Sequence, residues 1–111
     1  MIILVPASTL WQFDLTYDGG VLPVHLVVDG YEGDCEKLKD VDLIYRFLDE
    51  YPSVIGMTKI IPPQVYTYCG QTPEDWGVSG FVLIAESHIS LHTFPSRRYV
   101  NIDVFSCKDF N

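Results

Sequence analysis

The chain has 111 residues, 48% of them hydrophobic and 14% aromatic, and its formal net charge at pH 7 is −8. This length predicts one domain over residues 1–111, and the apolar content is sufficient to fill a core. The negative charge disfavours nucleic-acid binding, because phosphate backbones would be repelled, and no apolar run approaches the roughly 20 residues that a membrane-spanning helix needs.

The first half of the chain predicts one strand and one helix. The strand is expected over residues 22–28, which are mostly apolar. The helix is expected over about 38–51, where apolar residues recur at three- and four-residue steps. Asp34 or Asp40 could cap its start, and Pro52 ends it.

The second half is rich in strand patterns. Strands are expected near 57–61, over 80–85, over 89–94 and over 99–107. Residues 69–77 read as an exposed loop, and residues 95–98 as a hairpin turn. One helix and several antiparallel strands indicate the α+β class: a two-layer sandwich with a mainly antiparallel sheet and a helix on one face.

The cysteines say little about chemistry. The three of them lie far apart in the sequence, with no CxxC pair, which supports neither a zinc site nor a disulfide framework. The N-terminal segment lacks the basic region of a signal peptide. We therefore expect a cytoplasmic protein that holds no metal.

Taken alone, Ser79 and the three histidines favour structural roles. Gly77-Val-Ser-Gly80 differs from the GxSxG elbow of hydrolases, because its second glycine comes one residue early, so Ser79 reads as a strand-entry serine. His88 and His92 lie four residues apart on a strand, roughly 13 Å from each other, so a shared metal is not expected. His25 is expected to be structural, with no visible partner.

The hairpin makes one specific geometric prediction. A turn centred between residues 96 and 97 places Ser87 opposite Ser106 and Glu86 opposite Cys107, with Cα atoms about 5 Å apart. A free cysteine is usually a small buried residue. In this register, however, the Cys107 thiol would stand beside the Glu86–Ser87 peptide bond.

Three stretches together resemble the prokaryotic S-adenosylmethionine decarboxylase family, over most of the chain from about His25. They are Gly77-Val-Ser-Gly80, Ala85-Glu-Ser-His-Ile-Ser-Leu-His-Thr-Phe-Pro95 and Val100-Asn-Ile-Asp-Val-Phe-Ser-Cys107. The Glu-Ser-His-x-x-x-His-Thr-x-Pro pattern with a later Asp-x-Phe-x-Cys is long and specific.

The resemblance implies a zymogen that makes its own cofactor by autocatalytic cleavage between Glu86 and Ser87. The Ser87 hydroxyl attacks the Glu86 carbonyl, and elimination from the resulting ester leads to a covalent pyruvoyl group at position 87. That group forms a Schiff base with the amine of the substrate and accepts electrons as carbon dioxide leaves. By resemblance, Cys107 protonates the resulting carbanion.

The resemblance also assigns Ser79 and His92 to self-processing. His92 is five residues from Ser87, about 16 Å along an extended strand, so it cannot easily reach its own cleavage site. Family members build the active site between two protomers. We therefore expect a homodimer in which Ser87 and Cys107 come from one subunit and Ser79 and His92 from the other.

The sequence departs from the family pattern at the substrate. Ser96 stands where the family usually has a glutamate that binds the ribose hydroxyls. The aromatic residue that would stack on adenine is one of Tyr66, Tyr68 and Trp76. The family usually continues past the cysteine, whereas this sequence stops at Asn111, and sheet left uncovered in this way would favour burial in an assembly.

The leading hypothesis is an S-adenosylmethionine decarboxylase that supplies the aminopropyl donor for spermidine, and so for polyamine, synthesis. An alternative keeps the pyruvoyl chemistry but takes arginine or ornithine, and Ser96 is the feature that favours it. A hypothesis from another class is a non-catalytic relative that binds a partner.

Overall fold

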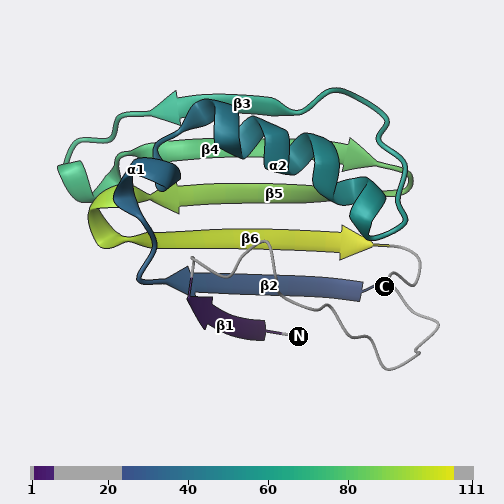
Figure 1. Ribbon diagram of the computed structural model, residues 1–111, viewed down its shortest axis with the longest axis horizontal. Coiled ribbons are helices and arrows are strands. Elements are labelled where there is room, and N and C mark those ends of the chain that lie inside the picture. Colours follow the sequence, from purple (N-terminus) through teal and green to yellow (C-terminus); the bar gives the residue numbers. More distant parts are fainter. Residues whose placement is uncertain (1, 7–23, 107–111) are drawn as a thin grey trace.

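The computed structural model describes residues 2–6 and 24–106, so Cys107 and residues 7–23 lie outside the described part. Its centre is a six-stranded sheet in the order β1-β2-β6-β5-β4-β3 (Figure 1). The strands are β1 (Ile2–Pro6), β2 (Val24–Tyr31), β3 (Gln64–Tyr68), β4 (Gly77–Ile84), β5 (Ser87–Phe94) and β6 (Tyr99–Ser106). All neighbours are antiparallel except β1, which runs parallel to β2.

Two helices follow β2, where the sequence predicts one. Helix α1 spans Cys35–Leu38 and α2 spans Val41–Val54. Asp34 Oδ1 accepts from the first turn of α1, and the extended backbone of Asp40 interrupts the helix and restarts it, with Asp40 Oδ1 accepting from the Leu43 amide at 3.1 Å. Both predicted caps are therefore used, one for each helix.

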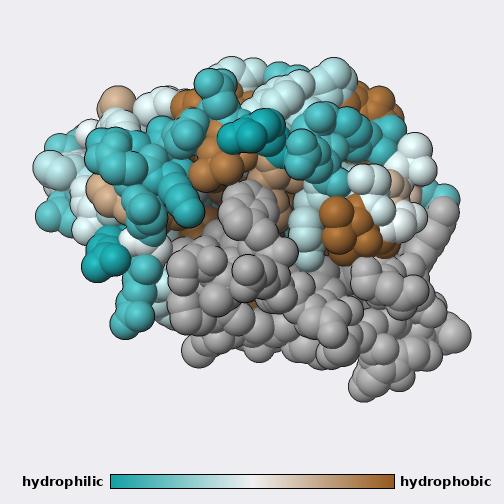
Figure 2. Space-filling view, viewed as in Figure 1, coloured by the Kyte–Doolittle hydropathy of each residue, from teal (hydrophilic) through white to brown (hydrophobic). Residues whose placement is uncertain are grey.

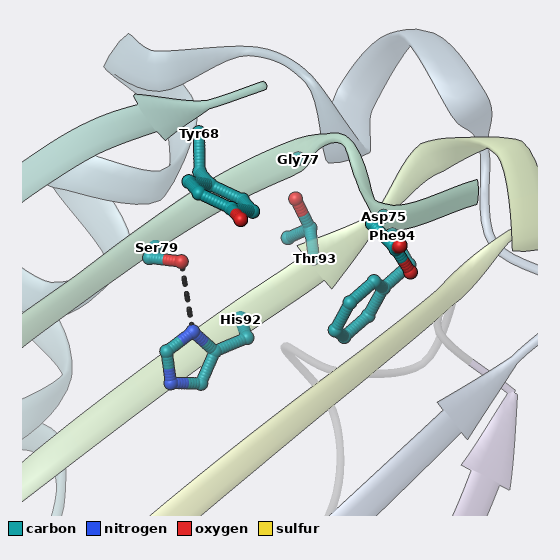
Figure 3. Close-up of a pocket in the computed structure, with 7 residues that line it drawn as sticks. All are labelled: Tyr68, Asp75, Gly77, Ser79, His92, Thr93 and Phe94. Atoms are coloured by element: carbon teal, nitrogen blue, oxygen red, sulfur yellow. Dashed lines mark hydrogen bonds between the residues drawn. The ribbon is translucent and has the colours of Figure 1, made fainter. Parts of the chain in front are cut away.

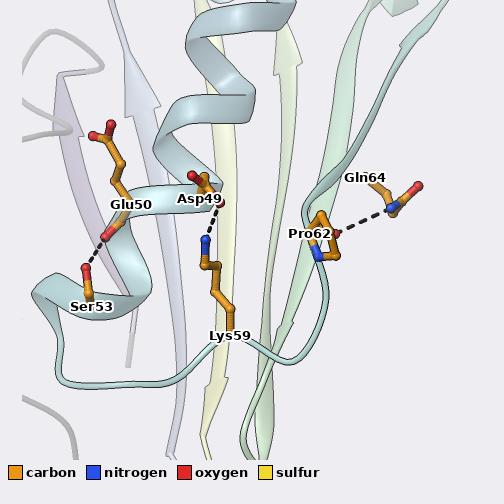
Figure 4. Close-up of polar contacts among 6 residues, drawn as sticks. All are labelled: Asp49, Glu50, Ser53, Lys59, Pro62 and Gln64. Carbon is orange, nitrogen blue, oxygen red and sulfur yellow. Dashed lines mark hydrogen bonds and ion pairs between the residues drawn. The ribbon is translucent and has the colours of Figure 1, made fainter.

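The prediction that Pro52 ends the helix is wrong. Pro52 lies inside α2, which continues to Val54. A proline this close to the end removes one hydrogen bond of the last turn, and the Pro52 ring is fully buried in return. Ser53 Oγ donates to the Glu50 carbonyl at 2.8 Å in the same turn (Figure 4).

The core lies between α2 and one face of the sheet (Figure 1). Alternate residues of the strands point into it. The hydrophobic residues of the four central strands that are almost completely buried are Leu26, Val28, Val78, Val82, Ile84, Ile89, Leu91, Val100, Ile102 and Val104. Gly80 allows α2 to approach β4 closely, because a Cβ there would lie 2.9 Å from Leu48 Cδ1. Figure 2 shows mostly hydrophilic side chains on the outside of this helical layer, with smaller hydrophobic patches between them.

The strand predicted near 57–61 is absent from the structure. Lys59 makes only an isolated bridge with Ile84, and the ladder to β4 begins at Gln64. Two prolines immediately before Gln64 lack the N–H that a ladder needs, which moves the strand along the chain. Instead, the connection is held by an ion pair from Lys59 to Asp49 of α2 (Figure 4).

The remaining elements agree with the sequence more closely. The hairpin of β5 and β6 has the predicted register, with Ser87 opposite Ser106. The predicted α+β two-layer architecture and its mainly antiparallel sheet are confirmed. β1, in the segment where no element is predicted, is an additional edge strand. Within the described residues, neither helix has the length and apolar character that crossing a membrane requires.

Candidate active site

The face of the sheet opposite α2, which we call the open face, carries a serine and a histidine in contact. Ser79 on β4 and His92 on β5 are cross-strand partners in the antiparallel register. His92 Nδ1 lies 2.8 Å from Ser79 Oγ, and Figure 3 shows the two side chains pointing toward each other. A histidine whose one ring nitrogen is held by a hydroxyl can exchange a proton through the other. The pair can therefore act as a positioned acid–base group.

This pair lines a cavity of about 400 Å³, which we call the histidine pocket. Its lining residues, drawn in Figure 3, are Tyr68, Asp75, Gly77, Ser79, His92, Thr93 and Phe94. Of the three aromatic candidates that the sequence offers, the structure brings Tyr68 to this pocket.

Gly77 and Thr93 brace the pocket. A Cβ at position 77 would lie 1.8 Å from the Thr93 carbonyl oxygen, so only glycine permits this approach of β4 and β5. The buried Thr93 hydroxyl accepts from the Val78 amide at 2.9 Å and donates to the Leu38 carbonyl at 2.7 Å. These contacts tie both strands to α1, and the Ser79–His92 pair therefore stands on a well-supported frame.

Two short 3-10 turns, Pro73–Asp75 and Pro95–Arg97, meet beside the pocket. Ser96 Oγ donates to the Pro73 carbonyl at 3.1 Å, and Arg97 Nη2 donates to Asp75 Oδ1 at 2.9 Å. We call these two contacts the turn clasp. The clasp fastens the loop before β4 to the hairpin between β5 and β6.

The other predicted substrate residues lie outside the histidine pocket. Ser96 and Trp76 line a second cavity of about 390 Å³ together with Gly70, Gln71, Thr72 and Pro73. Tyr66 is 65% exposed on β3, and its hydroxyl donates to Gln64 Oε1 at 3.1 Å. The structure thus distributes the predicted substrate residues over two cavities and the open face.

The Glu86–Ser87 bond lies at the far end of β5 from the clasp. It belongs to the short turn between β4 and β5, where Glu86 is exposed and Ser87 is half-buried. Ser87 has the same parity as the buried Ile89, whereas His92 points to the open face. The two side chains therefore project from opposite faces of one strand, and the predicted neighbour of the bond, Cys107, lies outside the described residues.

A second group of rings lies on the open face near that turn. The His88 ring stacks on Phe105 at 5.7 Å between centroids, and His25 meets the edge of Phe105 at 6.2 Å. His25 also pairs with Asp103, a partner that the sequence alone does not reveal. Within residues 2–6 and 24–106, no three His, Cys, Asp or Glu side chains come together as a metal site.

Sequence reasoning missed one polar cluster between β2 and β6. Asp29 Oδ1 accepts hydrogen bonds from Asn101 Nδ2, at 3.0 Å, and from the Tyr99 hydroxyl. Burial, reinforced by the hydrogen bond to Asp29, raises the pKa of Tyr99 to about 12. Asn101 is also the cross-strand partner of His92, which extends the polar surface beyond the histidine pocket. No local motif marks these residues, because β2 is far from β6 in the sequence.

Comparison with known proteins agrees with the architecture. Residues 24–111 match the family S-adenosylmethionine decarboxylase. The S-adenosylmethionine decarboxylase proenzyme of Oceanobacillus iheyensis is 33% identical over 89 residues, which are 80% of this chain and 66% of that protein. The proenzyme of Aquifex aeolicus is 34% identical over 88 residues, which are 79% of this chain and 61% of that protein.

The chain thus spans about three fifths to two thirds of the length of these curated relatives. Its fold is also similar to the crystal structure of the adenosylmethionine decarboxylase from Aquifex aeolicus, with a TM-score of 0.63 and 32% identity, over 82% of this chain and 70% of that one. From the family match and these relatives together, this chain belongs to the S-adenosylmethionine decarboxylase family.

Proposed function

We propose that this protein is an S-adenosylmethionine decarboxylase proenzyme that cleaves itself between Glu86 and Ser87. Its product would serve as the aminopropyl donor for spermidine synthesis. Family membership supports the reaction class. The observation that carries the proposal is the 2.8 Å contact of Ser79 and His92 in a cavity, because the resemblance assigns both residues to self-processing.

The surroundings of Ser87 suit a pyruvoyl group made from that residue. Ser87 begins β5 directly after a turn, so the peptide bond before it can change without loss of the central ladders. Glu86, the residue that would become a new C-terminus, is exposed. Once formed, the group supplies an electron sink for the loss of carbon dioxide from an α-amino acid.

The steps that form the group use the chain's own atoms and one water molecule. Ser87 Oγ loses its proton and bonds to the Glu86 carbonyl carbon, while the bond from that carbon to the Ser87 nitrogen breaks and the nitrogen takes up a proton. Loss of the Ser87 α-proton then releases Glu86 as a carboxylate and leaves dehydroalanine at position 87. The dehydroalanine tautomerises to an imine, water adds to it, and ammonia leaves, which gives the pyruvoyl group. A base and an acid are needed at each stage, and we assign them to a Ser79–His92 pair.

We assign that pair to the partner protomer of a homodimer. Ser87 and His92 of one chain lie five residues apart on β5 and project from opposite faces, which separates them within a protomer. The open face also carries large exposed apolar side chains: Tyr66 at 65%, Tyr68 at 59%, Phe81 at 40% and Leu83 at 39%. A two-fold contact through this face would bury these side chains. Any two-fold assembly in which Ser87 of one chain meets His92 of the other contains two equivalent sites.

Mass spectrometry of the denatured protein tests the proposal. We expect a fragment of residues 1–86 and a remainder that lacks one ammonia, whereas Ser87→Ala stays whole. Wild-type protein that stays quantitatively intact after long incubation would overturn self-processing.

The residue at position 96 favours a second candidate function. Ser96 lacks the carboxylate of the family glutamate, and its hydroxyl already donates to Pro73. A pyruvoyl enzyme that takes arginine or ornithine would not need a ribose contact there. Processed protein should be offered carboxyl-labelled S-adenosylmethionine, arginine and ornithine, with released carbon dioxide counted. Turnover of arginine or ornithine alone would favour the second candidate, and turnover of none would favour a non-catalytic binding role.

A further inference from the structure

The histidine pocket holds one carboxylate, that of Asp75, among its lining residues. Asp75 ends the 3-10 turn Pro73–Asp75, directly before Trp76 and β4. Sequence reasoning assigned no role to it, because residues 69–77 read only as an exposed loop. The loop nevertheless folds back so that Asp75 lies on the same cavity as His92.

Position 96 does not offer the pocket an equivalent group. The Ser96 hydroxyl donates to the Pro73 carbonyl at 3.1 Å, and Ser96 lines the second cavity rather than the histidine pocket. Through this hydrogen bond, Ser96 holds the turn that carries Asp75. A serine at this position therefore positions a carboxylate from another part of the chain.

Two hydrogen bonds orient the Asp75 carboxylate, and its oxygens can accept further ones. Arg97 donates to Oδ1 at 2.9 Å, and the Thr72 hydroxyl donates to Oδ2 at 3.0 Å. Each carboxylate oxygen has two lone-pair positions, so one on each oxygen stays available, and the Asp75 side chain is 49% exposed. Arg97 already balances the negative charge, which disfavours a second cation and leaves hydroxyl donors as the better match.

We propose that Asp75 accepts hydrogen bonds from two neighbouring hydroxyls of the substrate, as in the ribose of an adenosyl group. This inference rests on the proposed function. It makes Asp75, and not the residue at position 96, the residue that determines specificity for the substrate hydroxyls. Two oxygens of one carboxylate are spaced to accept from a vicinal diol, and the pocket supplies aromatic surface from Tyr68 and Phe94 beside it.

Equilibrium binding tests the inference without any turnover. The uncleaved Ser87→Ala protein keeps every residue of the histidine pocket, so adenosine and 2′-deoxyadenosine can be titrated into it by calorimetry. We expect adenosine to bind more tightly. Adding Asp75→Asn should weaken adenosine by roughly 10- to 150-fold, the usual effect of losing a charge-assisted hydrogen bond, and weaken 2′-deoxyadenosine much less. Glu74→Gln, which removes the neighbouring acid of the same turn, should leave both affinities unchanged.

Two further variants separate binding from loop structure. Arg97→Gln breaks the ion pair of the turn clasp but keeps the carboxylate, so preference for the diol should persist. Ser96→Glu added to Asp75→Asn should recover part of the lost adenosine affinity, because a carboxylate returns from the adjoining turn. In the processed wild-type background, Asp75→Asn should raise KM for S-adenosylmethionine and leave kcat within a few-fold.

The outcomes for the inference and for the proposed function are distinct. Equal loss of adenosine and 2′-deoxyadenosine affinity in Asp75→Asn, or no loss of either, would overturn the diol contact even if the enzyme cleaves itself and turns over substrate. Failure of the wild-type chain to cleave would overturn the proposed function, while the adenosine titrations would still decide the role of Asp75. Tighter binding of ornithine or arginine than of adenosine, lost in Asp75→Asn, would show a cation site and also overturn the inference.

Discussion

The two faces of the sheet are built from the same strands but carry different kinds of side chain. Toward α2, the four central strands present mostly buried Val, Leu and Ile, with Thr93 and Ser106 as buried polar residues. On the open face, the cross-strand registers align Ser79, His92, Asn101 and Asp29 in one row across β4, β5, β6 and β2. Strand alternation therefore separates the residues that fold the protein from the polar residues of the candidate site.

Ser87 is the informative exception to this division. It is a motif residue, yet it shares the parity of the buried Ile89 and not that of His92. In one protomer Ser87 and its proposed helper consequently lie on opposite faces. This difference is why the proposed chemistry requires a second protomer, and subunit mixing, described below, tests that requirement.

The largest expected effect is at Cys107, one residue beyond β6. If its thiol protonates the carbanion, Cys107→Ala should lower turnover by roughly 10²- to 10⁴-fold while some self-cleavage persists, because cleavage does not use that proton. Turnover of fully processed variant protein provides the measurement. Cys35→Ala, which removes an exposed cysteine at the start of α1, is the matched control. Wild-type turnover in processed Cys107→Ala would return Cys107 to a packing role.

A leucine-to-alanine substitution on each face of the sheet measures the difference between the two faces. Leu91 on β5 is 1% exposed on the helical side, and Leu83 on β4 is 39% exposed on the open face. Leu91→Ala should lower the free energy of unfolding by about 2–5 kcal/mol, because it leaves a cavity. Leu83→Ala should lower it by less than about 1 kcal/mol in dilute monomer and should instead weaken dimerisation. Chemical denaturation and analytical ultracentrifugation distinguish these results, and equal destabilisation by both variants would contradict the division.

The sequence could predict the features that depend on short-range patterns. The hairpin turn set the register of Ser87 and Ser106, and Asp34 and Asp40 are caps because their side chains reach amides two or three residues ahead. β1 could not be predicted in this way, since its parallel pairing with β2 depends on a distant segment.

The residues of the candidate site likewise fall into two groups: those that a local motif marks and those that none marks. Ser79 and His92 belong to recognisable motifs, and the structure adds that they touch. Asp75 and Asn101 belong to no local motif, and they join the site only through loop folding and sheet order. Contacts between segments that are distant in sequence leave no periodic signal that a single chain could reveal.

Subunit mixing tests whether residues from two protomers form one active site. Ser87→Ala and His92→Ala proteins should each stay uncleaved, but a heterodimer would contain one site with both residues intact. With free exchange, half of the dimers are mixed and one chain in each can be processed, so we expect cleavage of up to about a quarter of all chains. Mass spectrometry after mixing gives the fraction. Exchange shown by isotope labelling without any cleavage would contradict a shared site.

The smallest effect concerns Tyr99, whose hydroxyl donates to Asp29 on the open face. Its pKa is raised from 10.0 to about 12, first by burial and then by that hydrogen bond, so the folded state holds this proton more tightly than the unfolded state. The stabilisation is therefore fully present below pH 10 and is lost as the pH rises through about 12. We expect the ultraviolet titration of the folded protein to contain a late phenolate step that is missing in Tyr99→Phe and retained in Tyr45→Phe, which removes an exposed tyrosine of α2. Persistence of the late step in Tyr99→Phe would show that the Asp29 cluster does not hold this proton.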